Sequence, residues 1–251
     1  MTSADQSDHI VKAYDEEFAR LRKMFSQMSG LAESQLDGAL RAVARRDEEL
    51  AAAVRNKDQE IDDLETEIDA LVVRMLALRQ PVANDLRFIV AMLRMSADIE
   101  RMGDYAKNIA KRVHALAQLP VSSANPVTRS VSTLGRLVQA MLKDVFDACT
   151  DEDLKKAVAV WEADQEVDAL YTSIFRELLT YMMEDPRFIT AGTHLLFIAK
   201  NLERIGDHAT NIAETLHYRV DGKRLGDSRP KDDDTSVMVV GGPEDGPPSA
   251  A

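Results

Sequence analysis

Pairs of acidic side chains recur along this sequence with the same spacing, and they are the residues best suited to do chemistry. Glu100 and Asp104 lie four residues apart, and Glu203 and Asp207 repeat that pair 103 residues later. On a helix, residues four apart lie on one face, and carboxylates that share a face can coordinate a hard cation. Two further pairs in corresponding positions complete the set of candidate ligands, which comprises Asp58, Asp62, Glu100, Asp104, Asp164, Asp168, Glu203 and Asp207.

The spacing alone leaves open how the repulsion among these carboxylates is relieved. A divalent or trivalent metal ion that prefers oxygen ligands would relieve it directly, and salt bridges to basic side chains would relieve it without a metal. Either arrangement is expected on the protein surface, because Glu100 and Asp104 face away from the apolar seam of their helix. The arginines next to these pairs or at the starts of their helices are Arg87, Arg101, Arg187 and Arg204.

The elements that position these residues are predicted to be helices. The chain has 45% hydrophobic but only 5% aromatic residues, with little glycine and proline, which is typical of an all-α protein. Asp47 is expected to cap the start of the second helix. Apolar residues recur at intervals of three and four, and these seams predict helices around residues 11–43, 61–78, 92–116, 127–145, 167–181 and 195–216.

The six helices are predicted to form two tandem homologous three-helix bundles. Residues 58–64 match residues 164–170 at an offset of 106, and the later acidic segments match at an offset of 103. A short stretch with two prolines separates the halves and reads as a linker. We expect the bundles to span residues 8–118 and 127–220, and residues 221–251 to form a disordered acidic tail.

Each acidic segment also contains a glycine in the middle of its helix, Gly103 in the first and Gly206 in the second. Glycine in a helix interior costs about 1 kcal/mol relative to alanine, so the absence of a side chain must be useful there. Close approach of a neighbouring helix is favoured over contact with a ligand.

Composition excludes several classes of function. The net charge of -12 argues against nucleic-acid binding, which requires clustered basic residues. No apolar run approaches the roughly 20 residues that span a bilayer, and the single cysteine, Cys149, cannot form an intramolecular disulfide. We therefore expect a cytoplasmic protein that does not insert into a membrane.

Motifs for catalysis are also missing. The sequence has no glycine-rich phosphate loop, no His-Glu-x-x-His motif and no nucleophile elbow. A di-metal oxidase of the ferritin type would need Glu-x-x-His on two helices, and this chain has it once, at Glu214 and His217. The sequence predicts a protein that is not an enzyme.

Residues from about 8 to 220 resemble the PhoU family, bacterial regulators of phosphate transport and phosphate-starvation signalling. The resemblance rests on the doubled Glu-Arg-x-Gly-Asp element followed by Asn-Ile-Ala, on Arg-Gln-Pro-Val-Ala-Asn-Asp-Leu-Arg at 79–87, and on Asp-Pro-Arg at 185–187. It implies two bundles related by a pseudo-twofold axis, with iron or zinc clusters on the surface at the acidic pairs. It also implies a homodimer, and a role in linking a transporter ATPase subunit to a sensor histidine kinase as a negative regulator.

Two alternatives stay open: a metal-storage or metal-dependent redox bundle, and a helical scaffold without metal. The two halves also differ near their acidic pairs, which qualifies the transfer of family properties. Asp98 corresponds to Asn201 and Tyr105 corresponds to His208, so the two sites need not be equivalent in charge or in metal preference.

Overall fold

The protein is a long helical bundle, shown by a computed structural model that describes residues 3–119 and 126–225. No strand occurs within these residues, so the predicted all-α class is confirmed. The predicted acidic tail falls mostly at 226–251, outside the described residues. The helices are α1 (Ser3–Arg45), α2 (Glu48–Arg79), α3 (Ala83–Ala117), α4 (Pro126–Asp151), α5 (Leu154–Glu184) and α6 (Ile189–Asp221), with a short 3₁₀ helix, η1 (Pro186–Phe188), before α6.

The turns between the first two helices of each half have the same design. The Asp47 carboxylate accepts a hydrogen bond from the backbone N–H of Leu50 at 2.9 Å, which confirms the predicted cap of α2. Asp153 caps α5 in the same way. The residues just before these caps, Arg46 and Glu152, both have φ of 54°. The duplication therefore includes the backbone geometry of these turns.

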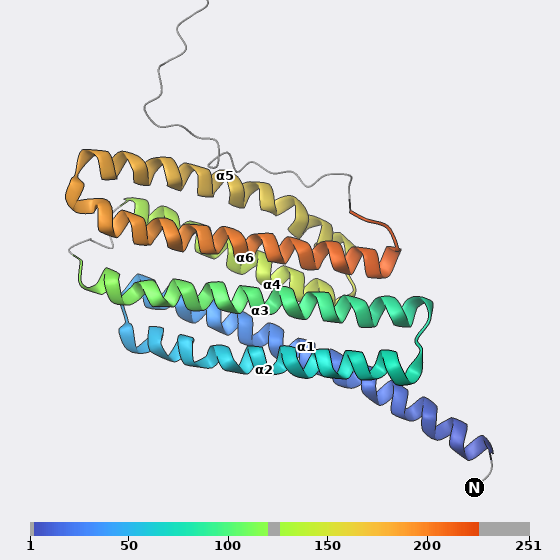
Figure 1. Ribbon diagram of the computed structural model, residues 1–251. Coiled ribbons are helices and arrows are strands. Elements are labelled where there is room, and N and C mark those ends of the chain that lie inside the picture. Colours follow the sequence, from blue (N-terminus) through green and yellow to red (C-terminus); the bar gives the residue numbers. More distant parts are fainter. Residues whose placement is uncertain (1–2, 120–125, 226–251) are drawn as a thin grey trace, which may run out of the picture.

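The two halves pack as a pair of three-helix bundles (Figure 1). Helices α1, α2 and α3 contact one another, and so do α4, α5 and α6; between the halves, α3 packs against α6 and α1 against α4. Each of the two contacts between the halves joins a helix to its counterpart in the other repeat. A twofold relation between two homologous units requires that their contacts map onto one another when the units are exchanged. The contacts α3–α6 and α1–α4 do so, so the predicted pseudo-twofold arrangement is confirmed.

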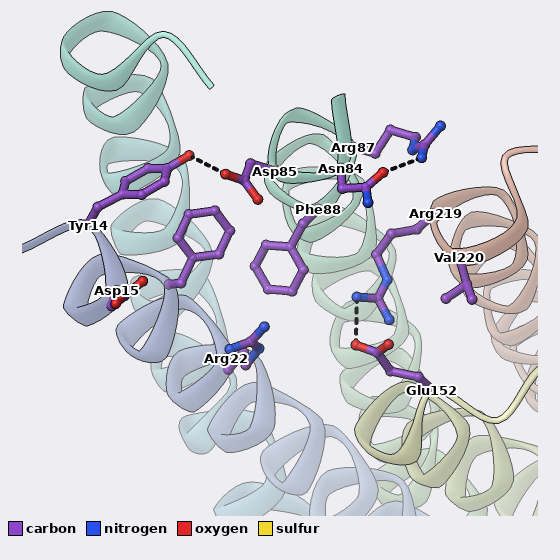
Figure 2. A pocket seen from close by; sticks show the side chains of 11 residues that line it. Tyr14, Asp15, Arg22, Asn84, Asp85, Arg87, Phe88, Glu152, Arg219 and Val220 are labelled. Atoms are coloured by element: carbon purple, nitrogen blue, oxygen red, sulfur yellow. Dashed lines mark hydrogen bonds and ion pairs between the residues drawn. The ribbon is translucent and has the colours of Figure 1, made fainter. Parts of the chain in front are cut away.

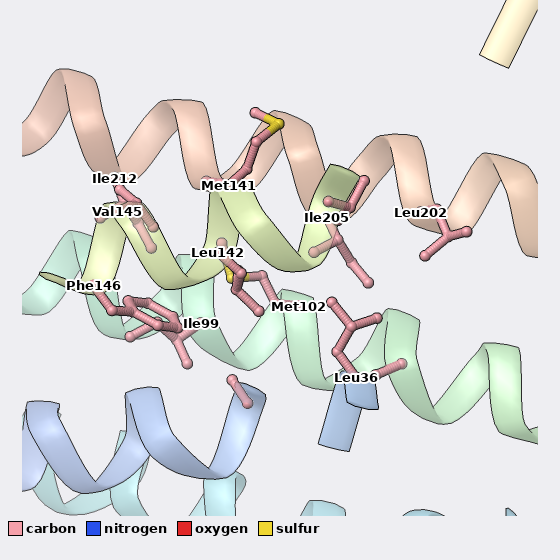
Figure 3. Close-up of a cluster of buried hydrophobic side chains, with 14 of the residues drawn as sticks. Leu36, Ile99, Met102, Met141, Leu142, Val145, Phe146, Leu202, Ile205 and Ile212 are labelled. Carbon is pink, nitrogen blue, oxygen red and sulfur yellow. The ribbon is translucent and has the colours of Figure 1, made fainter. Parts of the chain in front are cut away.

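The apolar seams of both halves meet in one continuous core (Figure 3). Ile99 and Met102 of α3 are almost completely buried, and Ile205 of α6 is completely buried. Leu142 and Phe146 bring α4 into the same cluster. Because both halves contribute to this core, burial of apolar surface stabilises the pair of bundles as well as each bundle alone.

The positions at which the repeats differ meet at the α3–α6 contact. His208 Nδ1 lies 2.7 Å from Asp98 Oδ1, and the amide of Asn211 donates to the same oxygen at 3.4 Å. The His208 ring also lies against Tyr105, with 5.6 Å between ring centroids. The sequence differences therefore form contacts between the two bundles, which explains why the halves are not identical there.

Candidate functional site

The acidic pairs lie where α3 crosses α2 and where α6 crosses α5, and the mid-helix glycines make these crossings close. A Cβ added to Gly103 would lie 3.0 Å from Gln35 Oε1 and 3.1 Å from Ile61 Cδ1, and a Cβ added to Gly206 would lie 3.3 Å from Val167 Cγ1. These distances are shorter than ordinary carbon contacts. The structure confirms that the glycines permit close packing of neighbouring helices.

This close packing corrects the expectation that all eight carboxylates lie on the surface. Four of them are buried, with exposed fractions of 1 to 4%, and the other four are half-buried. Helical periodicity describes one helix at a time, whereas α3 and α6 approach closely enough to cover side chains at the edges of the α2 and α5 seams. The buried carboxylates are Asp58, Asp164, Asp168 and Glu203.

In the first half, Asp58 is the centre of a polar network. The Gln35 amide donates to Asp58 Oδ1 at 2.9 Å, and the Lys107 ammonium donates to Asp58 Oδ2. Lys107 also lies 3.5 Å from Asp104 Oδ1. Hydrogen bonding to Asp58 raises the pKa of Lys107, because the bond favours its charged form. One lysine thus partly neutralises an acid from α2 and an acid from α3.

The remaining acids of this half are not fully neutralised. Partial burial, reinforced by neighbouring carboxylates, raises the pKa of Asp62, Glu65 and Glu100 above the ordinary values. Arg101, whose Nε lies 3.5 Å from Glu100 Oε2, opposes the shift at Glu100. Arg101, one of the arginines expected to neutralise the acidic pairs, therefore contributes to neutralising Glu100. The carboxylates of this face still destabilise one another's charged forms.

These shifts predict a pH dependence of stability. A carboxyl group whose folded-state pKa is raised contributes stability at low pH that is lost as the pH rises through that pKa. The double substitution Glu65→Gln/Glu100→Gln should therefore unfold at a higher denaturant concentration than the wild type at pH 7. The difference should vanish below the ordinary glutamate pKa of 4.5.

Chemical denaturation curves measured from pH 4 to pH 8 test this expectation. Glu60→Gln, at an exposed position on α2, the helix that carries Glu65, serves as the control. Its unfolding midpoint should equal that of the wild type at every pH. A double variant that is less stable than the wild type at pH 7 would contradict the repulsion inferred among these side chains.

The second half encloses its carboxylates more fully. The Lys200 ammonium donates to Glu203 Oε1 at 2.8 Å, and the Thr210 hydroxyl donates to Asp164 Oδ1 at 3.3 Å. Lys200 also lies over the ring of Tyr171, 4.8 Å from its centroid. The predicted equivalence of residues therefore does not extend to equal solvent access.

The residues present fit a hard cation better in the first half than in the second. Asp62, Glu100 and Asp104 are half-buried and bring only oxygen ligands. The pKa values of Asp62 and Glu100 are raised by burial and, to a smaller extent, by neighbouring carboxylates, and a cation would offset that second contribution. Within the described ranges, no three His, Cys, Asp or Glu side chains are grouped to hold a metal ion. Metal binding stays a prediction, and it would require these side chains to rotate toward a common centre.

Several residues of these networks were not anticipated. Lys107 follows Asp104 by three positions and Lys200 precedes Glu203 by three, a spacing that signals a helical ion pair. Gln35 comes from α1 and has no local signal. The single Glu-x-x-His motif has other roles, because Glu214 accepts from the indole of Trp161 at 2.9 Å and His217 Nδ1 contacts the Lys223 carbonyl at 3.0 Å.

In the part of the chain that the structure describes, no helix is both long and apolar enough to cross a bilayer.

The fold and the site together define a duplicated six-helix protein in which paired carboxylates lie at a glycine-permitted crossing in each half. The PhoU domain family model matches residues 25–113 and again 131–216, one match in each bundle. The chain belongs to the PhoU family.

Similar proteins cover nearly the whole chain. A Caulobacter vibrioides protein named phosphate-specific transport system accessory protein PhoU homolog is 54% identical over 225 residues, which cover 90% of this chain and 97% of that protein. A Rhizobium meliloti protein with the same name is 48% identical over 92% of this chain and 96% of its own length. The crystal structure of PhoU from Pseudomonas aeruginosa has a TM-score of 0.80 and 39% identity, covering 84% of this chain and all of that one.

Proposed function

We propose that this chain is an accessory protein of a phosphate transport system and that it acts without catalysing a reaction. The observation that carries the proposal is the length of the match: both repeats align with relatives of that name across 90% of the chain or more. A regulator of this kind needs surfaces for partners rather than a catalytic centre. Long continuous helices provide such surfaces.

In this proposal the protein is a negative regulator on the cytoplasmic side of the membrane. It links the ATPase subunit of the transporter to a sensor histidine kinase, so that ample phosphate keeps the starvation response off. Exposed apolar side chains gather at the ends of the two helical hairpins and suit such contacts. They include Val82 and Leu86 at the α2–α3 end, and Met183 and Ile189 at the α5–α6 end.

The test of this function is gene expression in cells that have ample phosphate. Deletion of the gene should raise expression of phosphate-starvation genes, and expression of the intact chain should restore repression. Normal repression in the deletion strain, together with altered cellular iron or zinc, would instead favour the metal-storage alternative.

The proposed metal role is regulatory. We assign the first-half carboxylates Asp62, Glu100 and Asp104 as the more accessible set of ligands for iron or zinc, since both metals accept carboxylate oxygens. A bound cation would add to the neutralisation by Lys107 and would make this surface less negatively charged toward a partner. The second-half set would need to release Lys200 from Glu203 before it could bind.

Metal content measures this assignment directly. In protein purified without added metal, the triple substitution Asp62→Asn/Glu100→Gln/Asp104→Asn should lower the iron or zinc content by the amount that one site holds. Its thermal stability should stay equal or rise, because repulsion among the carboxylates is removed. A control that removes the same charge from exposed positions, Glu49→Gln/Asp144→Asn/Glu162→Gln, should retain the metal. Unchanged metal in the triple variant would refute the assignment.

A further inference from the structure

A cavity of about 580 Å³ opens between the first helix and the ends of three later elements (Figure 2). Its wall is formed by α1, the first turn of α3, the last turn of α6 and the turn between α4 and α5. The acidic pairs are not part of it. The cavity is therefore separate from the candidate metal site.

Three arginines line this cavity, and they keep much of their capacity to donate hydrogen bonds. Among the described residues, Arg22 has no carboxylate partner, and Arg87 donates only to the neutral amide oxygen of Asn84. Arg219 is 9% exposed and pairs with Glu152 at 3.0 Å. The Nε atoms of Arg87 and Arg219 are buried and have no hydrogen-bond partner in the described part of the chain. Buried donors without acceptors are costly, and the other N–H groups of the three guanidinium groups, where they are not already used, can donate hydrogen bonds to an oxyanion in the cavity.

One aromatic ring holds two of these guanidinium groups in place. Arg22 lies 5.0 Å and Arg219 lies 5.5 Å from the centroid of the Phe88 ring, and the Phe18 ring packs 5.1 Å away. Cation–π contacts of this kind position arginine without consuming its hydrogen bonds. The arginines are thus arranged before any ligand arrives, which lowers the entropy cost of binding.

A second, more enclosed chamber of about 260 Å³ continues from the first. The two share Arg22, Phe88, Glu152 and Arg219 as walls. The volume of this inner chamber corresponds to about nine water molecules. Apart from the shared residues, its lining is largely apolar and includes Phe25, Met92, Met95, Cys149 and Leu216.

The charges of the outer cavity decide which ligand fits. Its arginines are balanced by three acids, Asp15, Asp85 and Glu152, so charge alone gives a small inorganic anion little net attraction. The apolar chamber behind the arginines adds a favourable term only for a ligand with an apolar part. We propose that this two-chamber cavity binds an amphiphilic oxyanion, with its head among Arg22, Arg87 and Arg219 and a short apolar body in the inner chamber.

Calorimetric titration with four probes tests this site and separates its possible ligands. Octyl phosphate and octanoate, used below their micelle concentrations, should bind saturably with one site per chain, and the tighter of the two identifies the head as phosphate or carboxylate. Inorganic phosphate and octyl glucoside should bind at least about tenfold more weakly, because each lacks one of the two parts. Failure of both octyl anions to bind, or equal binding by octyl glucoside, would overturn the proposal.

Variants locate the binding. Arg22→Gln/Arg87→Gln should weaken the octyl anion about tenfold or more, since charge-assisted hydrogen bonds are lost. The control Arg20→Gln/Arg136→Gln removes the same charge from exposed positions and should bind as the wild type does. Ser26→Leu, at the exposed edge of the inner chamber, should weaken octyl phosphate while leaving the melting temperature unchanged. Binding that none of these substitutions alters would place the ligand elsewhere and contradict the proposal.

Discussion

Replacing Gly103 by leucine is expected to lower the free energy of unfolding by about 3 kcal/mol, the upper end of the usual cost of overpacking. Even a Cβ at this position would lie 3.0 Å from Gln35 Oε1, 3.1 Å from Ile61 Cδ1 and 3.5 Å from Asp58 Oδ1. A full leucine side chain would push α3 away from both α1 and α2. Equilibrium denaturation in guanidinium, followed by circular dichroism, measures the loss.

The matched control is Gly30→Leu in the exposed middle of α1, where an added Cβ would meet nothing within 4 Å. This substitution should stabilise the protein by about 0.5 to 1 kcal/mol, since leucine favours helix more than glycine does. If both variants were stabilised alike, the close crossing at Gly103 would not constrain the fold.

Replacing Asp58 by alanine is the second large effect that the structure predicts, a loss of about 2 kcal/mol. The side chain is 2% exposed, and its removal deprives the Gln35 amide and the Lys107 ammonium of their shared acceptor. Lys107 is 29% exposed, so water can partly solvate it, which keeps the cost below that of a fully buried charge. Thermal and denaturant unfolding at pH 7 measure the change.

Asp62→Ala provides the comparison within the same acidic pair. The Asp62 carboxyl group is half-buried and its pKa is raised by burial and by Asp58, so its removal should change stability by less than about 0.5 kcal/mol or increase it. Equal losses for the two variants would show that Asp58 and Asp62 contribute equally to stability. That result would contradict the inference that Asp58 has a structural role and Asp62 is the more accessible candidate ligand.

The sequence was sufficient to predict the fold because its signals are local and repeated. Spacings of three and four located the helices, Asp47 marked the start of α2, and the doubled acidic segment indicated a duplication that the packing of α3 against α6 confirms. Some helices extend well beyond their apolar seams. The predicted seam at 167–181 covers only part of α5, which begins at Leu154. The first turns of α5 contain few large apolar residues, so the apolar pattern did not reveal them.

The site could be predicted only in part, since burial depends on distances between helices. The acidic pairs and the close approach at the glycines followed from the sequence, but which carboxylates the crossing helices cover did not. Gln35 reaches Asp58 from another helix, 23 residues away in the sequence. The arginine cavity joins Arg22, Arg87 and Arg219, which no local pattern brings together.

Co-purification from living cells tests the central claim most directly. The tagged chain, recovered from cells grown with ample phosphate and analysed by mass spectrometry, should bring with it the ATPase subunit of the phosphate transporter and a sensor histidine kinase. A variant with charged residues at the exposed hairpin ends, Leu86→Glu/Ile189→Glu, should fold normally and recover less of these partners. Recovery of neither partner by the intact chain, under conditions in which both are expressed, would contradict its proposed role in phosphate transport and signalling.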